Sequence, residues 1–286
     1  SGHRQVIRRA VDIAAEAGII SAVMTFDPHP RVVLGQDEYA HCITPLSAKL
    51  ALIEELGIDR TYVVKFDADF SKLHPEQFVE HMLKPLSLHA LVVGFDFTFG
   101  FQGRGTAKTL KELAEPGIRV EIVDPYHING EKVSSTLIRE QLLSGRIPEA
   151  NALLGRPYSL SGTVVRGDGR GRSIGFPTAN IALTEPFIIP KPGVYAIEAE
   201  LKGQTYHGVM NIGYKPTFSD KRDLTLEAHL FHYSGNLYDE RLTIRFRAFI
   251  REERKFPSVD ELVRQIRSDA EQARKWLAAA AAEPAG

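Results

Sequence analysis

The chain has 286 residues, of which 43% are hydrophobic and 25% are charged, and its formal net charge is −1. This balance is typical of a soluble globular protein with two ordinary domains, and it provides no global attraction to nucleic acid or to an anionic membrane. The single cysteine, Cys42, excludes an internal disulfide framework and is compatible with a reducing compartment, and no apolar run approaches the roughly 20 residues of a membrane span.

Helices and apolar strands alternate in the first half of the chain. Apolar residues spaced by three and four predict a helix from the start of the chain to Gly18. Because alternation with uniformly apolar strands is typical of a parallel sheet covered on both faces, we expect such a sheet, with the strand before the first helix absent. Further strands are predicted at 19–26, 61–66, 90–95 and 119–123, and further helices at 45–56, 78–83 and 109–113.

Three loops of this half are candidate ligand sites, because ligands of open α/β sheets bind at the carboxyl ends of the strands. Gly2-His3 lies at a helix start, where backbone N–H groups favour a phosphate; an ordinary surface histidine is the alternative. T-F-D-P-H-P at 25–30 is a turn stiffened by two prolines, or ordinary loop chemistry. V-S-S-T-L-I-R at 133–139 offers three hydroxyls and an arginine at a helix start, which is more than a helix cap requires and suits an oligophosphate.

The second half is predicted to be mainly β structure. A short helix at 147–154 is followed by Gly155-Arg156-Pro157, which marks a domain boundary near residue 155. Strands at 158–165, 193–201, 205–211, 225–231 and 241–251, separated by Gly, Pro and Asn/Asp clusters, predict an antiparallel barrel or sandwich. An amphipathic pattern at 259–282 predicts a long final helix.

The stretch R-G-D-G-R-G-R-S-I-G-F-P-T-A-N at 166–180 is the most unusual of the chain. Its glycines let backbone N–H groups approach an anion closely. Thr178 and Asn180 add oxygens that suit Mg²⁺. A glycine-rich hairpin with a solvated basic tip is compatible with the same composition, because a lone glycine loop is a weak signal.

Glu227 lies in one of the predicted strands of the second half. Alternation would place it on the face of His229, opposite Leu226, Ala228 and Leu230. A solvated carboxylate on the outer face of a barrel is the ordinary interpretation of such a position. By itself, this residue therefore predicts no chemistry.

Together these motifs resemble the bacterial bifunctional riboflavin kinase/FMN adenylyltransferase (FAD synthetase) family. The Gly2-His3 helix start, T-F-D-P-H-P, V-G-F-D-F-T-F-G at 93–100 and V-S-S-T-L-I-R resemble its adenylyltransferase half. The stretch at 166–180, G-V-M-N-I-G-Y-K-P-T-F at 208–218 and L-E-A-H-L-F at 226–231 resemble its kinase half. The resemblance covers nearly the whole chain in the family's order.

Two features depart from the family pattern. The family begins with a strand and a loop G-x-F-D-G-x-H-x-G-H, whose second histidine matches His3, and everything before that point is absent here. Lys215 stands where the family usually has arginine, which keeps the charge but loses the bidentate fork.

The resemblance implies a fold of the α/β plus β class. Residues 1–155 would form a Rossmann-like FMN adenylyltransferase domain, incomplete at its N-terminus, and residues 156–286 an antiparallel β-barrel riboflavin kinase domain with a long C-terminal helix. The barrel would phosphorylate riboflavin to FMN, and the first domain would adenylylate FMN to FAD with release of pyrophosphate. The implied partners are riboflavin, FMN and ATP with Mg²⁺, and no nucleic acid or membrane; the protein would be a cytoplasmic monomer or weak homo-oligomer.

The resemblance also implies roles for individual residues. Glu227 would accept the proton of the substrate hydroxyl, as a general base does in phosphoryl transfer, while Thr178 and Asn180 would hold Mg²⁺. In the first half, His3 and Arg139 would be catalytic and would hold ATP phosphates together with Ser134, Ser135 and Thr136. In the second half, ATP would lie against Gly167, Gly169, Arg170, Gly171 and Arg172. A flavin pocket in the first half would be lined by Pro28, Pro30, Asp96, Phe97 and Phe99; core packing is the alternative for the phenylalanines.

Two other functions are compatible with parts of the sequence. One is a riboflavin kinase alone, because the adenylyltransferase half lacks its first strand. The other is a nucleic-acid-binding barrel that uses Arg166, Arg170 and Arg172, which predicts surplus positive charge and aromatic stacking positions on the barrel. The near-neutral charge balance and the acidic residues beside this loop oppose the second function.

Overall fold

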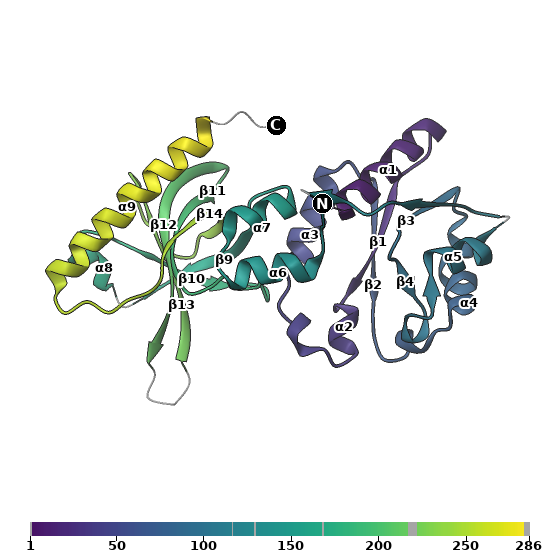
Figure 1. Ribbon diagram of the computed structural model, residues 1–286, viewed down its shortest axis with the longest axis horizontal. Coiled ribbons are helices and arrows are strands. Elements are labelled where there is room, and N and C mark those ends of the chain that lie inside the picture. Colours follow the sequence, from purple (N-terminus) through teal and green to yellow (C-terminus); the bar gives the residue numbers. More distant parts are fainter. Residues whose placement is uncertain (1, 116, 129, 168, 217–221, 283–286) are drawn as a thin grey trace. The chain divides into compact units, whose positions relative to one another are not determined.

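The chain forms two compact units, residues 1–134 and 135–286 (Figure 1). The structure is a computed structural model that describes residues 2–115, 117–128, 130–167, 169–216 and 222–282. Among the helices of these ranges, none is both long enough and apolar enough to cross a membrane.

Parallel strands and covering helices make up the first unit, as the sequence predicts. β1 (Ala22–Asp27) pairs in parallel with β2 (Arg60–Lys65), and β3 (Ala90–Gly94) pairs in parallel with β6 (Arg119–Val123). Within the described residues, no strand pairing joins these two pairs. Short antiparallel pairs are formed by β4 (Thr98–Phe99) with β5 (Gly105–Thr106) and by β7 (His127–Ile128) with β8 (Glu131–Lys132). The absence of a strand before the first helix stays a prediction.

Five α-helices lie in the described part of this unit: α1 (Gly2–Ala17), α2 (Pro30–Val33), α3 (Leu46–Glu55), α4 (Pro75–Phe78) and α5 (Ala107–Ala114). A π-helical turn, Val79–Leu83, continues α4. One boundary was predicted wrongly, because Ile19 and Ile20 are exposed and precede β1 instead of starting it. Gly18, with a φ of 65°, ends α1, and the two isoleucines lie in the turn between helix and strand.

A closed antiparallel barrel of six strands forms the second unit, which confirms the barrel prediction. The strands are β9 (Ser159–Val165), β10 (Ala179–Leu183), β11 (Gly193–Leu201), β12 (Gln204–Pro216), β13 (Arg222–Leu230) and β14 (Arg241–Arg251), in the order β10-β13-β12-β11-β14-β9. Tyr195, Met210, Ile212 and Phe246 are completely buried. The strand β10 was missed, because its five residues directly follow the glycine-rich stretch and carry too few alternations to show a period.

The helices of the second unit are α6 (Ser135–Leu143), α7 (Ile147–Leu154), α8 (Arg170–Ser173) and α9 (Val259–Ala282). The long helix α9 lies along the barrel (Figure 1) and packs Ala270, Ala273 and Leu277 against Val194 and Ala248. Its predicted position at 259–282 is confirmed. The two compact units divide between residues 134 and 135, so α6 and α7 belong to the second unit. The predicted domain boundary near residue 155 stays a proposal.

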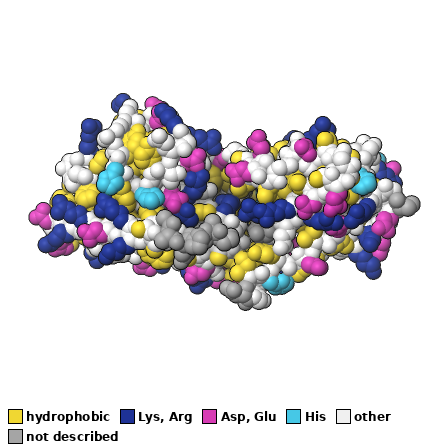
Figure 2. Space-filling model, turned by 90° about the horizontal axis from the view of Figure 1, so that it is seen from above, with side chains coloured by type: hydrophobic (Ala, Val, Ile, Leu, Met, Phe, Trp, Pro, Cys, Tyr) yellow, Lys and Arg dark blue, Asp and Glu magenta, His cyan; other side chains and the backbone are white. Residues whose placement is uncertain are grey.

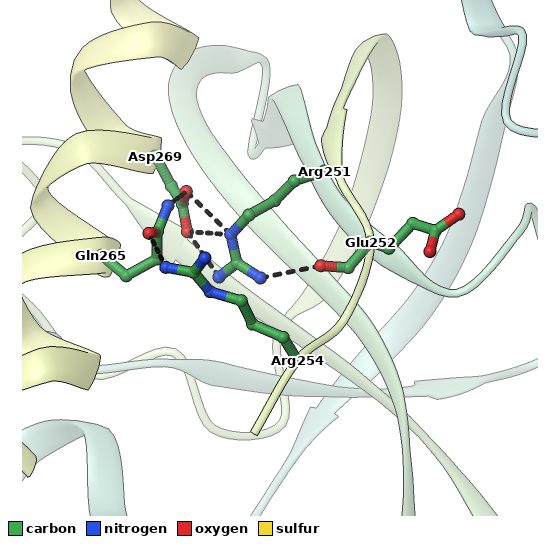
Figure 3. Close-up of polar contacts among 5 residues, drawn as sticks. All are labelled: Arg251, Glu252, Arg254, Gln265 and Asp269. Atoms are coloured by element: carbon green, nitrogen blue, oxygen red, sulfur yellow. Dashed lines mark hydrogen bonds and ion pairs between the residues drawn. The ribbon is translucent and has the colours of Figure 1, made fainter. Parts of the chain in front are cut away.

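A buried ion pair holds α9 to the end of β14 (Figure 3). Arg251 donates to both carboxylate oxygens of Asp269, at 2.7 to 3.1 Å, and the Asp269 side chain is only 3% exposed. Gln265 donates to the same carboxylate at 2.7 Å and accepts a hydrogen bond from Arg254. The last residue of β14, Arg251, and Arg254 of the segment that follows it are therefore both tied to α9.

Candidate functional site

Three polar residues stand in register across three neighbouring strands of the barrel. Asn180 in β10 lies directly opposite Glu227 in β13, and Glu227 lies directly opposite Asn211 in β12. Residues that are directly opposite in an antiparallel sheet share a face, with Cβ atoms about 4.5–5.5 Å apart. Asn180, Glu227 and Asn211 therefore form a continuous row, which we call the polar row.

The polar row lies on the face of the barrel that points away from its interior. Leu226, Ala228 and Leu230 are buried, whereas Glu227 and His229, on the opposite face, are only partly buried. This arrangement confirms the alternation expected from the sequence. It leaves the Glu227 carboxylate accessible to a ligand lying on the outside of the strands.

Thr178, the residue directly before β10, also lies beside the polar row. Its hydroxyl donates to the Glu227 carboxylate across 3.5 Å. The approach of this segment is fixed by His229, whose Nδ1 donates to the carbonyl of Pro177 at 2.8 Å and whose ring meets that of Phe176 edge-on. The structure thus brings the three residues Thr178, Asn180 and Glu227 together, although 49 positions separate the first from the last in the sequence.

Two of the predicted glycines are needed for this close packing. A Cβ on Gly167 would collide with the side-chain amide of Asn180, and a Cβ on Gly171 would collide with the carbonyl oxygen of Phe176. The glycine-rich stretch is not an open loop, because it contains the single helical turn α8, entered through Gly169 with a φ of 69°. Its glycines therefore bring the backbone directly against the two candidate metal ligands.

The loop arginines have separate environments. The Arg166 guanidinium lies 5.8 Å from the ring of Tyr238, and Arg172 is exposed. The side chains of Arg170 and Lys215, and residues 217–221, lie outside the described residues. The phosphate contacts predicted for Arg170 and Arg172 stay predictions.

In the first unit, polar groups gather at the ends of the parallel strands. Lys49, in α3, donates to the Thr25 hydroxyl at 3.2 Å, and Lys132 donates to the Asp96 carboxylate at 3.2 Å. Desolvation lowers the pKa of the His3 imidazole below its ordinary value, against the opposing effect of the Asp96 carboxylate. The His3 residue is nevertheless exposed to solvent. Two predicted site residues, His3 and Asp96, therefore lie within electrostatic reach of each other, and the lysines are additions that the sequence did not single out.

The predicted flavin-pocket residues divide into surface and core positions. Pro28 is exposed at the end of β1, and Pro30 begins α2. Phe97 stacks on Phe99 with 5.6 Å between ring centres, and Phe99 is 7% exposed within the core of this unit. Core packing, the alternative considered for these phenylalanines, thus describes Phe99, whereas Phe97 is only partly buried.

The hydroxyl-rich motif at 133–139 spans the division between the two units. Ser134 ends the first unit, and Ser135 opens α6 of the second, followed by Thr136 and Arg139 on the same helix. Each unit is defined by itself, so the predicted meeting of His3 with these residues stays a prediction.

Comparisons with known proteins agree with this two-part organisation. The FAD synthetase family matches residues 1–137, and the riboflavin kinase family matches residues 154–277. A protein of Bacillus subtilis, named bifunctional riboflavin kinase/FMN adenylyltransferase, is 44% identical over 279 residues, covering 96% of this chain and 88% of its own. A protein of Listeria monocytogenes with the same name is 41% identical over 278 residues, with coverage of 97% and 88%.

A solved structure resembles the whole chain. It is the crystal structure of a macrolide-efflux protein from Streptococcus pneumoniae, with a TM-score of 0.89 and 33% identity over 96% of this chain and 90% of that one. The two family matches and the two relatives above agree on flavin chemistry. From the solved structure we therefore take only the fold.

Proposed function

Because the chain belongs to the bifunctional riboflavin kinase/FMN adenylyltransferase family, we propose that it makes FAD from riboflavin in two ATP-dependent steps. The second unit phosphorylates riboflavin to FMN, and the first adenylylates FMN to FAD. The alternative of a riboflavin kinase alone is not favoured, since residues 1–137 match the FAD synthetase family.

The kinase step rests on one observation, the register that sets Glu227 between Asn180 and Asn211. Glu227 accepts the proton of the terminal hydroxyl of riboflavin while that oxygen bonds to the γ-phosphorus of ATP and the bond to ADP breaks. A positioned general base of this kind contributes typically 10²–10⁴-fold to a rate. Alignment and charge stabilisation supply much of the remainder in phosphoryl transfer.

The oxygen donors beside Glu227 suit a magnesium ion. Mg²⁺ prefers few protein ligands and keeps several waters and substrate phosphates. The hydroxyl of Thr178 and the amide oxygen of Asn180 would hold it, and the ion would neutralise charge on the ATP phosphates. Among the described residues no group of three or more His, Cys, Asp and Glu side chains forms a metal site.

The glycine-rich stretch provides the phosphate contacts of the kinase step. Gly167 and Gly171 lie directly beside the side chains of Asn180 and Thr178, since glycines permit that approach, and their backbone N–H groups, with that of Gly169, would contact the ATP phosphates. Arg170 and Arg172 would add positive charge. These roles follow the family resemblance and the packing of the loop against Asn180.

The adenylylation step uses the ends of the strands in the first unit. A phosphate oxygen of FMN bonds to the α-phosphorus of ATP, and pyrophosphate leaves. His3 with Ser134, Ser135, Thr136 and Arg139 would hold the ATP phosphates. Pro28, Pro30, Asp96 and Phe97 would contact the flavin, for which flat proline and aromatic surfaces are suited.

We further propose that the protein acts in the cytoplasm, as a monomer or weak homo-oligomer, on small molecules and not on nucleic acid. Basic and acidic side chains are interspersed on the face drawn in Figure 2. The charges on that face are therefore of mixed sign, whereas a nucleic-acid-binding surface gathers Lys and Arg on one face.

One assay tests the two activities. The protein is incubated with riboflavin, ATP and Mg²⁺, and FMN and FAD are separated by chromatography over time. We expect FMN first and FAD later. If no FMN forms, the kinase proposal is wrong; if FMN accumulates without FAD, the adenylylation proposal is wrong for this chain.

A further inference from the structure

The side chain of His229 holds the chain where the pairing of β10 with β13 has ended. In the described part of the chain these strands share two residue pairs, of which the first is Ala179 with Ala228. Pro177 and Thr178 precede this pair, so the backbone ladder does not hold them. The Nδ1–H group of His229 donates to the Pro177 carbonyl at 2.8 Å and thereby ties these two residues to β13.

The bonded carbonyl belongs to the peptide group that joins Pro177 to Thr178. This group is planar, so a hydrogen bond to its oxygen also restricts the direction of the nitrogen and the Cα atom of Thr178. Only the rotations of Thr178 itself can then move its hydroxyl. Since this hydroxyl donates to Glu227 across 3.5 Å, the bond made by His229 acts directly on the geometry of a proposed metal ligand.

His229 is itself held in place by the barrel. Its backbone lies opposite Val209 in β12, and a Cβ on Gly208 would collide with the His229 carbonyl oxygen, so the glycine permits a close approach of the two strands. The imidazole ring also meets the ring of Phe176 edge-on, with 5.4 Å between ring centres. A paired strand therefore carries the donor, whereas the acceptor lies in the connection that leads into β10.

The glycine-rich stretch holds the same connection from its other side. The backbone N–H group of Phe176 donates to the carbonyl of Gly171 at 2.8 Å. Pro177 has no N–H group, so its carbonyl is the only backbone group through which it can form a hydrogen bond. Loss of the His229 bond would therefore leave residues 176–178 attached to the glycine-rich stretch but not to β13.

We propose that His229 is a positioning residue of the kinase step, which holds the peptide group between Pro177 and Thr178 so that the Thr178 hydroxyl lies beside Glu227, where it would hold Mg²⁺. The proposal rests on the proposed role of Thr178 as a metal ligand. It requires an N–H donor at the position of Nδ1, and it gives His229 no part in the proton transfer to Glu227.

Two substitutions separate the donor from the ring. His229→Asn keeps an N–H donor near the position of Nδ1, and His229→Phe keeps an aromatic ring without a donor. We expect the Mg²⁺ concentration for half-maximal FMN formation to rise about threefold to tenfold in His229→Phe, as for the loss of one hydrogen bond, and to stay near its original value in His229→Asn. The KM for riboflavin should change much less.

The matched control is His207→Phe, which replaces an exposed histidine in β12 and should leave the Mg²⁺ requirement unchanged. An unchanged requirement in His229→Phe would overturn the proposal. So would an equal rise in His229→Asn and His229→Phe, because the ring and not the hydrogen bond would then be what matters.

Nucleotide binding provides a readout without turnover. Calorimetric titration of the whole chain with ADP is carried out with and without Mg²⁺, and binding to the first unit is common to all variants. With Mg²⁺, the affinity of the kinase site should fall about threefold to tenfold in His229→Phe and be retained in His229→Asn. Without Mg²⁺, both variants should bind ADP as the unaltered protein does. A loss of affinity that is independent of Mg²⁺ would contradict the proposal, because His229 would then act on the nucleotide or on the fold.

Combination with a change at Thr178 provides an independent test. Thr178→Val keeps the branched shape of the side chain and removes its hydroxyl. If His229 acts through this hydroxyl, His229→Phe should raise the Mg²⁺ requirement of the Thr178→Val protein little further. Full additivity of the two changes would show that His229 does not act through Thr178. Failure of the proposed metal role of Thr178 is distinguishable, because Thr178→Val alone would then have a normal Mg²⁺ requirement.

Discussion

The carboxylate of Glu227 lies 3.5 Å from the hydroxyl of Thr178, and Glu227 faces Asn180 directly across β10 and β13. A slip of one residue in this pairing would turn every side chain of the strand to the other face of the barrel. The buried residues Leu226 and Ala228 oppose such a slip. The barrel interior thus sets the geometry of the proposed kinase site on its outer face.

Replacement of this carboxylate by an amide tests its role as the base. Glu227→Gln should lower kcat for FMN formation by about 10²–10⁴-fold, because the amide cannot accept the hydroxyl proton. Riboflavin binding, followed by fluorescence quenching, should change little. FMN formation at the normal rate would exclude Glu227 as the base. FAD formation from added FMN serves as the internal control, since it uses the first unit.

The packing of Gly167 and Gly171 predicts that alanine at these two positions impairs FMN formation to different degrees. Gly167→Ala collides with the side chain of Asn180, which can shift, whereas Gly171→Ala collides with the backbone carbonyl of Phe176, which cannot shift without moving the loop. We expect Gly167→Ala mainly to raise the Mg²⁺ concentration needed for half-maximal FMN formation. Gly171→Ala should lower kcat more strongly. Gly117→Ala, whose new Cβ would have 3.8 Å to its nearest neighbour, is a control that should leave FMN formation unchanged.

Much of this arrangement follows from the sequence. The strands 193–201 and 241–251 and the helix 259–282 have the predicted bounds. Long segments with a clear hydrophobic period give the strongest signal of secondary structure. The pairing of Asn180 with Glu227 has no such signal. It depends on the strand order of the closed barrel, which places β10 beside β13 although β11 and β12 lie between them in the chain.

The residues that sequence reasoning did not assign a role share one property. Asn211 stands in a quoted motif, and Glu253 in a run of charged residues, but neither is distinguished by its neighbours in the chain. Both are placed by long-range contacts: Asn211 lies opposite Glu227, and the Glu253 carboxylate occupies the space where a side chain at Gly213 would lie. The exposure of Ile20 was missed for a related reason, since an apolar residue in a turn resembles the strand it precedes.

The lowered pKa of His3 predicts a pH dependence for the first unit. In the free protein desolvation lowers the pKa of this imidazole below its ordinary value, which favours the neutral form. A bound phosphate raises the pKa, so binding takes up a proton when the pH lies between the two values. ATP affinity should therefore rise as the pH falls from about 7 toward 6.

Calorimetric titration with ATP, in two buffers of different ionisation enthalpy, measures this proton uptake. His3→Gln should lose the part of the uptake that belongs to His3, while protonation of ATP itself and binding at the kinase site stay the same in both proteins. Equal proton uptake by the two proteins would show that His3 does not contact the phosphates.

The pair Arg251–Asp269 makes a prediction for stability. Removal of one partner from a buried pair leaves the other charge uncompensated and costs about 3–5 kcal/mol. Asp269→Ala should therefore lower the free energy of unfolding of the second unit by about this amount. The double replacement Arg251→Met with Asp269→Leu should recover most of the loss, because two apolar side chains leave no buried charge.

The single tryptophan of the chain, Trp276, lies on α9 and reports this unfolding. Its fluorescence is followed through a urea titration of each variant. Glu252→Ala, which breaks the exposed pair with Lys191, should change the free energy by at most about 1 kcal/mol. An Asp269→Ala protein with an unchanged free energy of unfolding would show that this pair does not hold α9 to the barrel.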